Sequence, residues 1–205
     1  MQLTSHWQRH PWPPGERRLH WYLLPDASIY PAVERARRRI GGAEWDFVAD
    51  EWLHCTITSL AIGRAALGTQ GSERLVDRVT EAVRALSMPL PLPAVVGVPH
   101  VFSEGLVWRL EPQAPIQALC RAVGRASAEF VAEPRPATFV PHITLAYPNA
   151  AVDAGPPLAV LQTAGDALPA SEFATLHLLD VWRVPGRYCW DPVAEVSLEP
   201  SPRNT

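Results

Sequence analysis

The sequence contains no lysine, so all 18 of its basic side chains are arginines. This absence excludes covalent catalysis through a lysine amine, such as Schiff-base chemistry. Acidic side chains slightly outnumber basic ones and the net charge is −3. Proteins that coat nucleic acid by electrostatics alone carry a strong basic excess. That class is therefore excluded, whereas a small nucleotide or a single RNA end remains a compatible partner.

Cysteine and long apolar runs are also scarce. Cys55, Cys120 and Cys189 are odd in number and far apart, so they form neither a zinc spacing nor a disulfide framework. No apolar run approaches the ~20 residues of a membrane span, and the N-terminus lacks the apolar centre of a secretory signal. We therefore expect a cytoplasmic monomer that has no membrane contact and needs neither metal nor cofactor.

The spacing of apolar residues predicts a mixture of helices and strands. Strands are expected at 19–24, 52–60, 90–101, 105–110, 139–147, 173–184 and 188–198, and helices at 28–40, 72–86, 115–130 and 158–167. Prolines interrupt the strand at 90–101, which favours an edge position. Residues 1–18 are expected to be a flexible leader and 199–205 a disordered tail, flanking one domain at 19–198.

Each half of the chain contains two of these helices and three or four of these strands. Such a pattern is typical of an α+β architecture in which each sheet is covered by helices. We expect two similar lobes of antiparallel sheet with outer helices, and a central cleft between the sheets.

Two short runs carry most of the functional information. They are Leu53-His54-Cys55-Thr56-Ile57 and Pro141-His142-Ile143-Thr144-Leu145, and their histidines are 88 residues apart. In a strand, residues two apart point to the same face, so each run presents an imidazole beside a hydroxyl. With seven histidines and ten threonines in 205 residues, about 0.3 such triplets are expected by chance. Two triplets in strand-like runs disfavour a purely structural role for these histidines.

Two histidines on opposite sides of a phosphorus atom match the needs of phosphodiester hydrolysis. Imidazole, with an unperturbed pKa of ~6.5, supplies both a base and an acid near neutral pH. One of His54 and His142 would take a proton from water, and the other would protonate the departing ribose oxygen. Thr56 and Thr144 would donate hydrogen bonds to the nonbridging oxygens, where charge develops.

Three further residues are candidates for substrate binding. Arg109 alternates with apolar neighbours and would clamp a phosphate, although a solvated strand arginine is the competing interpretation. Tyr22 and Tyr147 would stack on a base, with an aromatic core position as the alternative. His20, His100 and His177 have no hydroxyl partner at the right offset and are interpreted as structural.

The two runs resemble the signature of the two-histidine phosphoesterase superfamily, which includes the LigT-like 2′-5′ RNA ligases and cyclic nucleotide phosphodiesterases. The resemblance extends to 18–25 (RLHWYLLP), to Ile62-Gly63 after the first run and to 139–146 (FVPHITLA). It implies the bilobal LigT-like fold and catalysis by His54 and His142 on a 2′,3′-cyclic phosphate. Many family members have an arginine after the second run, where this chain has Tyr147, so the phosphate or base contact at that position differs.

Three functions follow from these observations. The leading one is metal-independent hydrolysis of 2′,3′-cyclic phosphates at RNA ends or in small cyclic nucleotides. The second is reversible 2′-5′ RNA ligation, although hydrolysis is energetically favoured in water. The third is a noncatalytic module that binds nucleotides or RNA ends, but such a module has no need for two matched proton-transfer groups.

Overall fold

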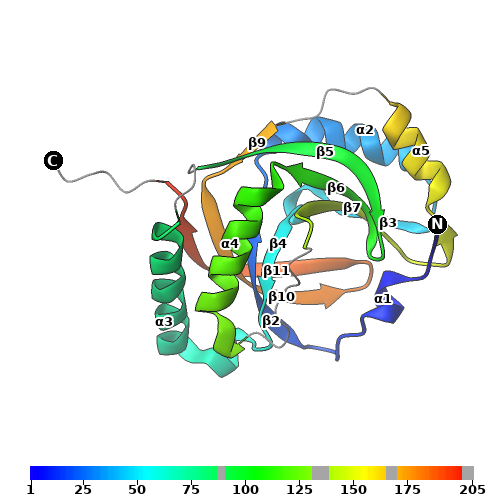
Figure 1. The fold of residues 1–205 in the computed structure, drawn as a ribbon. Coiled ribbons are helices and arrows are strands. Elements are labelled where there is room, and N and C mark those ends of the chain that lie inside the picture. The colour runs from blue at the N-terminus through cyan, green and yellow to red at the C-terminus, as the bar shows by residue number, and fades with distance from the viewer. Residues whose placement is uncertain (87–90, 131–138, 165–169, 200–205) are drawn as a thin grey trace.

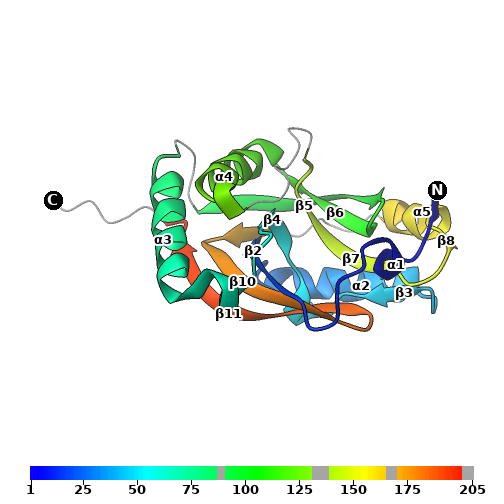
Figure 2. The same cartoon turned by 90° about the horizontal axis from the view of Figure 1, so that it is seen from below.

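The computed structural model of the chain describes residues 1–86, 91–130, 139–164 and 170–199. Two antiparallel sheets form the centre of the molecule, and helices pack around them (Figures 1 and 2). The predicted α+β class with two lobes of antiparallel sheet is thereby confirmed. Most of the tail expected at 199–205, and the end of the helix expected at 158–167, lie outside the described residues.

The first sheet combines early and late parts of the chain. Within the described residues its strands are, in spatial order, β11 (Arg187–Ser197), β10 (Thr175–Val184), β2 (Arg17–Leu23) and β4 (Cys55–Ser59). All neighbouring strands are antiparallel, and β10 and β11 form a hairpin. Its turn contains Gly186 at φ +77°, a left-handed conformation that glycine adopts without steric penalty.

The second sheet contains the other long strands. Within the described residues its spatial order is β3 (Trp45–Phe47), β7 (His142–Pro148), β6 (Gly105–Glu111), β5 (Leu92–Phe102) and β9 (Ala170–Phe173). A short pair, β1 (Gln2–Leu3) and β8 (Val152–Asp153), lies beside it. The strand expected at 173–184 is thus two strands in different sheets, separated at Ala174.

Helices cover both sheets at opposite ends of the molecule (Figure 1). They are α1 (His6–Arg9), α2 (Tyr30–Ile40), α3 (Arg64–Arg84), α4 (Gln113–Ala126) and α5 (Gly155–Thr163), with 3₁₀ turns η1 (Ala27–Ile29), η2 (Asp50–Trp52) and η3 (Ala128–Phe130). α3 packs on α4, and α2 packs on α5. α3 begins before the predicted 72 because the chain is already helical on the N-terminal side of a kink at Gly68, whose φ is +68°.

Strand alternation separates the core from the functional face of the first sheet. Leu19, Trp21 and Leu23 of β2 are fully buried in a core that also receives side chains from the second sheet and from α2, α3 and α4. His20 and Tyr22 point to the opposite face. The hydrophobic effect therefore fixes which side chains of β2 remain available for chemistry.

The two motif strands lie side by side where the sheets meet. β4 is the last strand of the first sheet, and it contacts β7 of the second. The backbone N–H of Val48 donates to the Leu145 carbonyl at 3.0 Å, which ties the segment before β4 to β7. Two strands distant in sequence are thus held together by the same packing that closes the core.

Residues 1–18 are not a loose leader, contrary to the expectation from their polar composition. They contain β1, α1 and the start of β2, and Leu3 and His6 are buried. The Trp7 indole donates to the Asp46 carboxylate at 2.6 Å. Local composition was misleading here because the segment is ordered by partners far away in the sequence.

The strand expected at an edge, β5, pairs with β6, and within the described residues it pairs with β9 as well only over Leu92–Val95. A register shift lies between Val96 and Pro99, and such a bulge tolerates a residue without an N–H donor. Pro93 lies opposite Glu172 on the short strand β9. Pro93 is therefore accommodated between two paired strands, whereas Pro99 lies where, within the described residues, β5 is paired with β6 alone.

No helix in the described ranges combines the length and apolar character needed to cross a membrane.

Candidate active site

His54 lies immediately before β4, after the 3₁₀ turn η2. Its Nδ1 atom is 2.8 Å from the Trp52 carbonyl oxygen. Because a carbonyl only accepts hydrogen bonds, Nδ1 carries the proton in this contact. In the neutral ring the lone pair is therefore on Nε2, which is the atom left to exchange a proton.

His142 is the first residue of β7 and repeats the same arrangement. Its Nδ1 donates to the Val140 carbonyl at 2.7 Å, again the residue two positions earlier. The backbone before it is anchored by the Leu110 N–H, which donates to the Pro141 carbonyl at 2.9 Å. Both motif histidines thus share one tautomer and offer Nε2.

The His54 ring is held between aromatic side chains. It stacks on Tyr22 with ring centroids 4.2 Å apart and planes 12° apart, and Trp190 meets it edge-on at 5.3 Å. Tyr22 is held in turn by His20, whose Nδ1 lies 3.1 Å from the tyrosine hydroxyl. His54 is buried, with 8% of its surface exposed, and packing fixes the orientation of its ring.

The His142 ring lies among different neighbours. Phe102 meets it edge-on at a centroid distance of 4.9 Å. Its Nε2 is 3.8 Å from a carboxylate oxygen of Glu104, and its side chain is 16% exposed. Like His54, it is oriented by the protein, but it is more exposed.

The two threonines accompany the histidines as the period-two pattern predicts. Thr56 is half-buried and lies opposite Tyr22 in the register of β4 and β2. Thr144 is buried and is hydrogen-bonded to the hydroxyl of Tyr147. Each sheet therefore contributes an imidazole, a hydroxyl and a tyrosine.

Tyr147 and Tyr188 connect the two halves of this group. Their ring centroids are 5.7 Å apart, and Tyr188 is 6.5 Å from the His54 ring. Burial, Tyr188 and Glu104 raise the pKa of Tyr147 well above its usual value, so its phenol stays protonated. We call His54, Thr56, His142, Thr144, Tyr22, Tyr147 and Tyr188 together the junction site. The structure thus brings both motifs to one place.

Arg109 lies next to the junction site, opposite His142 in the register of β6 and β7. Its guanidinium is 3.5 Å from the Glu111 carboxylate, and its side chain is 37% exposed. Its Nε atom is buried without a hydrogen-bond partner. Cross-strand pairing gives Arg109 the same face as His142.

Several residues around the junction site were missed by sequence reasoning. Tyr188 and Trp190 alternate on β11, so their shared face was predictable, but their contact with His54 depends on pairing through two other strands. His6 belongs to α1 and lies 4.4 Å from the Tyr147 ring. Nothing in the local sequence pointed to that contact.

His6 is a strongly perturbed histidine beside Tyr147 and Tyr188. Its Nε2 is 2.9 Å from the Tyr188 hydroxyl, which also accepts a hydrogen bond from Arg183. Burial, followed by the charge of Arg183, lowers the pKa of His6 to about 3. His6 is therefore neutral at physiological pH and supports the tyrosines rather than adding positive charge.

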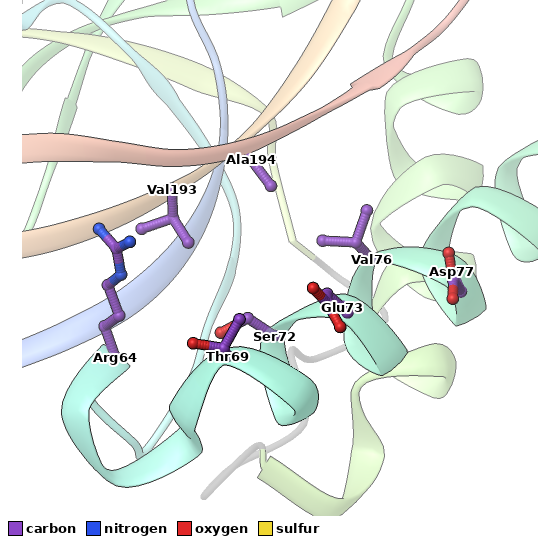
Figure 3. A pocket seen from close by; sticks show the side chains of 8 residues that line it. All are labelled: Arg64, Thr69, Ser72, Glu73, Val76, Asp77, Val193 and Ala194. Atoms are coloured by element: carbon purple, nitrogen blue, oxygen red, sulfur yellow. The ribbon is translucent and has the colours of Figure 1, made fainter.

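A separate pocket of about 320 Å³ lies between α3 and β11 (Figure 3). Thr69, Ser72 and Glu73 line it from α3, and Val193 and Ala194 line it from β11. None of the predicted site residues lines this pocket. Across the described parts of the chain, no three His, Cys, Asp or Glu side chains are grouped closely enough to hold a metal ion.

Comparison with known proteins gives a consistent result. The family model of the 2′-5′ RNA ligase superfamily matches residues 25–186. The chain is similar in structure to Escherichia coli LigT complexed with 3′-AMP, with a TM-score of 0.64 and 17% identity over 89% of this chain and 98% of that one. A Thermus thermophilus protein gives a TM-score of 0.58 and 17% identity over 88% and 97% of the two chains.

The PDE domain of MHV ns2 is a third similar structure, with a TM-score of 0.51 and 16% identity over 82% of this chain and all of that domain. No curated protein matches in sequence. At these identities the structural likenesses show the fold alone, whereas the family model covers most of the chain.

Proposed function

Because this chain belongs to the 2′-5′ RNA ligase superfamily, we propose that it is a metal-independent phosphodiesterase that hydrolyses 2′,3′-cyclic phosphates. The resemblance that the two motifs indicate is confirmed at the level of the family and of the LigT-like fold. The substrate would be an RNA end or a small cyclic nucleotide. His54 and His142 are proposed as the catalytic pair.

The matched hydrogen bonds of the two imidazoles carry this proposal. Each Nδ1 donates to the carbonyl two residues earlier, at 2.8 Å for His54 and 2.7 Å for His142. A backbone carbonyl orients the ring without neutralising the charge that the ring gains on protonation. The two rings are oriented by the same kind of hydrogen bond, and β4, which follows His54, contacts β7. This arrangement suits a reaction in which one histidine removes a proton and the other delivers one.

In the proposed reaction, the neutral histidine accepts a proton at Nε2 from the water that attacks phosphorus. The other histidine, as imidazolium, delivers a proton from Nε2 to the ribose oxygen as its bond to phosphorus breaks. The product is a phosphate monoester beside a free ribose hydroxyl. Which of His54 and His142 begins as the base is left open.

Other residues of the site would bind the phosphate. Thr56 and Thr144 would donate hydrogen bonds to the nonbridging oxygens, where negative charge increases in the transition state. Arg109 would contribute positive charge beside His142. The stacking on a base expected of Tyr22 and Tyr147 is not supported, because the two residues are only 2% and 5% exposed and lie in buried clusters. Tyr22 stacks on His54 instead.

Structures of the similar protein E. coli LigT support a nucleotide as the ligand. They are complexes with 3′-AMP, NADP⁺, ATP and phosphate. A single nucleotide or RNA end as partner also suits the absence of a basic excess in this chain. All three cysteines are buried thiols rather than disulfides, in keeping with the cytoplasmic location that we propose for this protein, acting as a monomer.

Incubation with a cyclic-phosphate-ended oligonucleotide and a chelator tests the proposal. We expect conversion of the cyclic end to a monoester, unaffected by the chelator. Joined ends would favour 2′-5′ ligation instead, and binding without turnover would favour a noncatalytic module. Loss of cleavage in chelator would contradict the metal-independent mechanism.

A further inference from the structure

Tyr188 belongs to the junction site, but the proposed reaction assigns it no role. It lies near the tip of the β10–β11 hairpin and is half-buried. Its ring centroid is 6.5 Å from that of His54 and 5.7 Å from that of Tyr147. The Tyr147 hydroxyl is in turn hydrogen-bonded to Thr144. Tyr188 therefore lies between the groups that the two motifs contribute, where the phosphate is expected to bind.

Two basic side chains hold the hydroxyl of Tyr188. Arg183 of β10 donates a hydrogen bond to it, and the Arg183 guanidinium also lies over the tyrosine ring, 4.5 Å from its centroid. Because a guanidinium has no acceptor, the tyrosine oxygen accepts in this contact. Nε2 of His6 lies 2.9 Å from the same oxygen. The hydroxyl is thus fixed from β10 and from α1 at once.

The direction of the His6 contact follows from the other nitrogen of its ring. Burial lowers the pKa of His6 to about 3, so at neutral pH one ring nitrogen carries a proton and the other a lone pair. Nδ1 is buried and has no hydrogen-bond partner in the described parts of the chain. A proton on Nδ1 would leave a buried N–H unpaired, and orphaned N–H groups are rarer in folded proteins than unfilled acceptors. The proton is therefore on Nε2, which donates to Tyr188.

With both of its acceptor positions occupied, the Tyr188 hydroxyl still has its own proton to donate. No third group in the described ranges forms a hydrogen bond with this hydroxyl. Burial raises the pKa of Tyr188, and Arg183 opposes this change without reversing it, whereas Glu104 acts in the same direction as burial. The phenol is therefore protonated at neutral pH, and its donor is available to a ligand.

Tyr188 offers on the first sheet what Arg109 is proposed to offer on the second. Arg109 lies opposite His142 and would contact the phosphate from that side. Arg183 is a cation on the other side, and it is bonded to Tyr188 and to the His10 carbonyl. A phenol that accepts from a guanidinium is a stronger donor, because hydrogen bonds in a chain polarise one another. Tyr188 therefore transmits part of the effect of the Arg183 charge to a bound anion.

We propose that Tyr188 is a further catalytic residue, whose hydroxyl donates a hydrogen bond to a nonbridging oxygen of the phosphate bound in the junction site. This role rests on the proposed function, since it assumes that the two motif histidines flank the phosphorus. Negative charge on that oxygen increases as water attacks, so the hydrogen bond strengthens in the transition state. Thr56 and Thr144 would then share the phosphate oxygens with a third donor that neither motif contains.

The variant Tyr188→Phe tests this role, because it removes the hydroxyl and keeps the ring. The matched control is Tyr30→Phe, at a half-buried position of α2 that packs on the core. Calorimetry measures the affinity for adenosine 3′-monophosphate, and hydrolysis of a 2′,3′-cyclic nucleotide measures kcat. In Tyr188→Phe the ligand should bind at least about tenfold more weakly, and kcat should fall about 100-fold. Tyr30→Phe should match the wild type in both measurements.

Circular dichroism and the melting temperature check that each variant is folded. Unchanged affinity in Tyr188→Phe, or no binding of the ligand to the wild type, overturns the proposed role of Tyr188. A similar loss in Tyr30→Phe would attribute the effect to packing and would overturn it too. If Tyr188→Phe weakens binding while the wild type hydrolyses no cyclic phosphate, the phosphate contact of Tyr188 is supported and the proposed function is contradicted.

Discussion

At the residue scale, the decisive feature is a hydrogen bond from each imidazole to its own backbone. The carbonyls of Trp52 and Val140 fix the orientation of His54 and His142 and assign the proton to Nδ1. A pair of loosely held histidines would lose rotational freedom on binding substrate, which lowers the rate. Here each ring is already oriented in the folded protein, so little further rotational entropy is lost when substrate binds.

Replacing either histidine by alanine should abolish most of the activity. A positioned general acid or base contributes about 10²–10⁴-fold, so we expect at least ~100-fold lower kcat for His54→Ala and for His142→Ala. Activity is measured on a 2′,3′-cyclic nucleotide, and circular dichroism checks the fold. His100→Ala, which changes an exposed histidine of β5, should remain active. Near-normal turnover in either motif variant would refute the assignment.

His6 predicts a specific dependence of stability on pH. The unfolded chain binds a proton at this residue below about pH 6.5, but the folded chain does so only near pH 3, since that is its pKa in the structure. Stability therefore rises with pH in this window and is lost as the pH falls. Between pH 8 and pH 5, this one group should cost about 2 kcal/mol of unfolding free energy.

Urea unfolding of the wild type and of His6→Gln at pH 8 and pH 5 measures this contribution. The variant lacks the titrating group, so its stability should fall about 2 kcal/mol less over the same interval. Identical pH dependences in the two proteins would show that His6 is solvated rather than buried.

At the element scale, the pairing of β6 with β7 depends on one close approach. A Cβ atom at Gly105 would lie 2.1 Å from the Ala146 carbonyl oxygen. Side chains do not fit at that distance, so alanine would push apart the strand that carries His142 and Thr144. Glycine at this position keeps both residues in register with Arg109 and Val107.

Gly105→Ala should therefore destabilise the protein by about 3 kcal/mol, at the upper end for an overpacked site. The matched control is Gly124→Ala in α4, where the nearest atom to a new Cβ is Thr58 Oγ1 at 3.9 Å. Alanine is the better helix former by up to about 1 kcal/mol, so the control should be neutral or stabilising. Chemical denaturation measures both, and a harmless Gly105→Ala would argue against this strand pairing.

Elements with strong local periodicity could be predicted from the sequence, and so could the pairing of each histidine with its threonine. The spacing of apolar residues predicted a helix at 28–40, and α2 ends at Gly41, where φ is +53°. The assignment of strands to sheets could not be found in this way, because Ala174 separates two strands that look continuous. Register between distant strands depends on tertiary packing, which local patterns do not encode.

The candidate site, too, could be predicted from the sequence only where its residues form a local pattern. The two motifs predicted His54 and His142 as the catalytic pair because each histidine is followed two positions later by a threonine. Glu104 and His6 carry no local signature, and only the folded chain shows that they lie near Tyr147. The polar composition of residues 1–18 predicted a flexible leader, although His6 and a few of its neighbours are buried.

At the scale of the whole molecule, residues 1–12 bridge the two sheets. Trp7 is bound to Asp46 of β3, while Arg183 of β10 donates to the His10 carbonyl. β1 adds a pairing with β8, and Arg9 donates to the Ser103 carbonyl in the β5–β6 turn. The segment therefore connects the β10–β11 hairpin to the second sheet beside the junction site.

Deleting residues 1–12 should lower the melting temperature and loosen the β10–β11 hairpin. Hydrogen exchange of amides around Pro185 and Gly186 should accelerate, because the hairpin loses its link to the second sheet. Gln8→Ala, on an exposed position of α1, serves as the control. Unchanged exchange in the deletion variant would mean that the bridge does not restrain the hairpin.

The first sheet also joins strands from the two ends of the described chain: β2 and β4 come early, and β10 and β11 come last. During synthesis on the ribosome, both histidines emerge before Trp190, the ring that meets His54 edge-on. A nascent chain thus contains both motif histidines before β10 and β11 of the first sheet have been made. Under the proposed function, activity should therefore appear late in translation, and truncated products should be inactive.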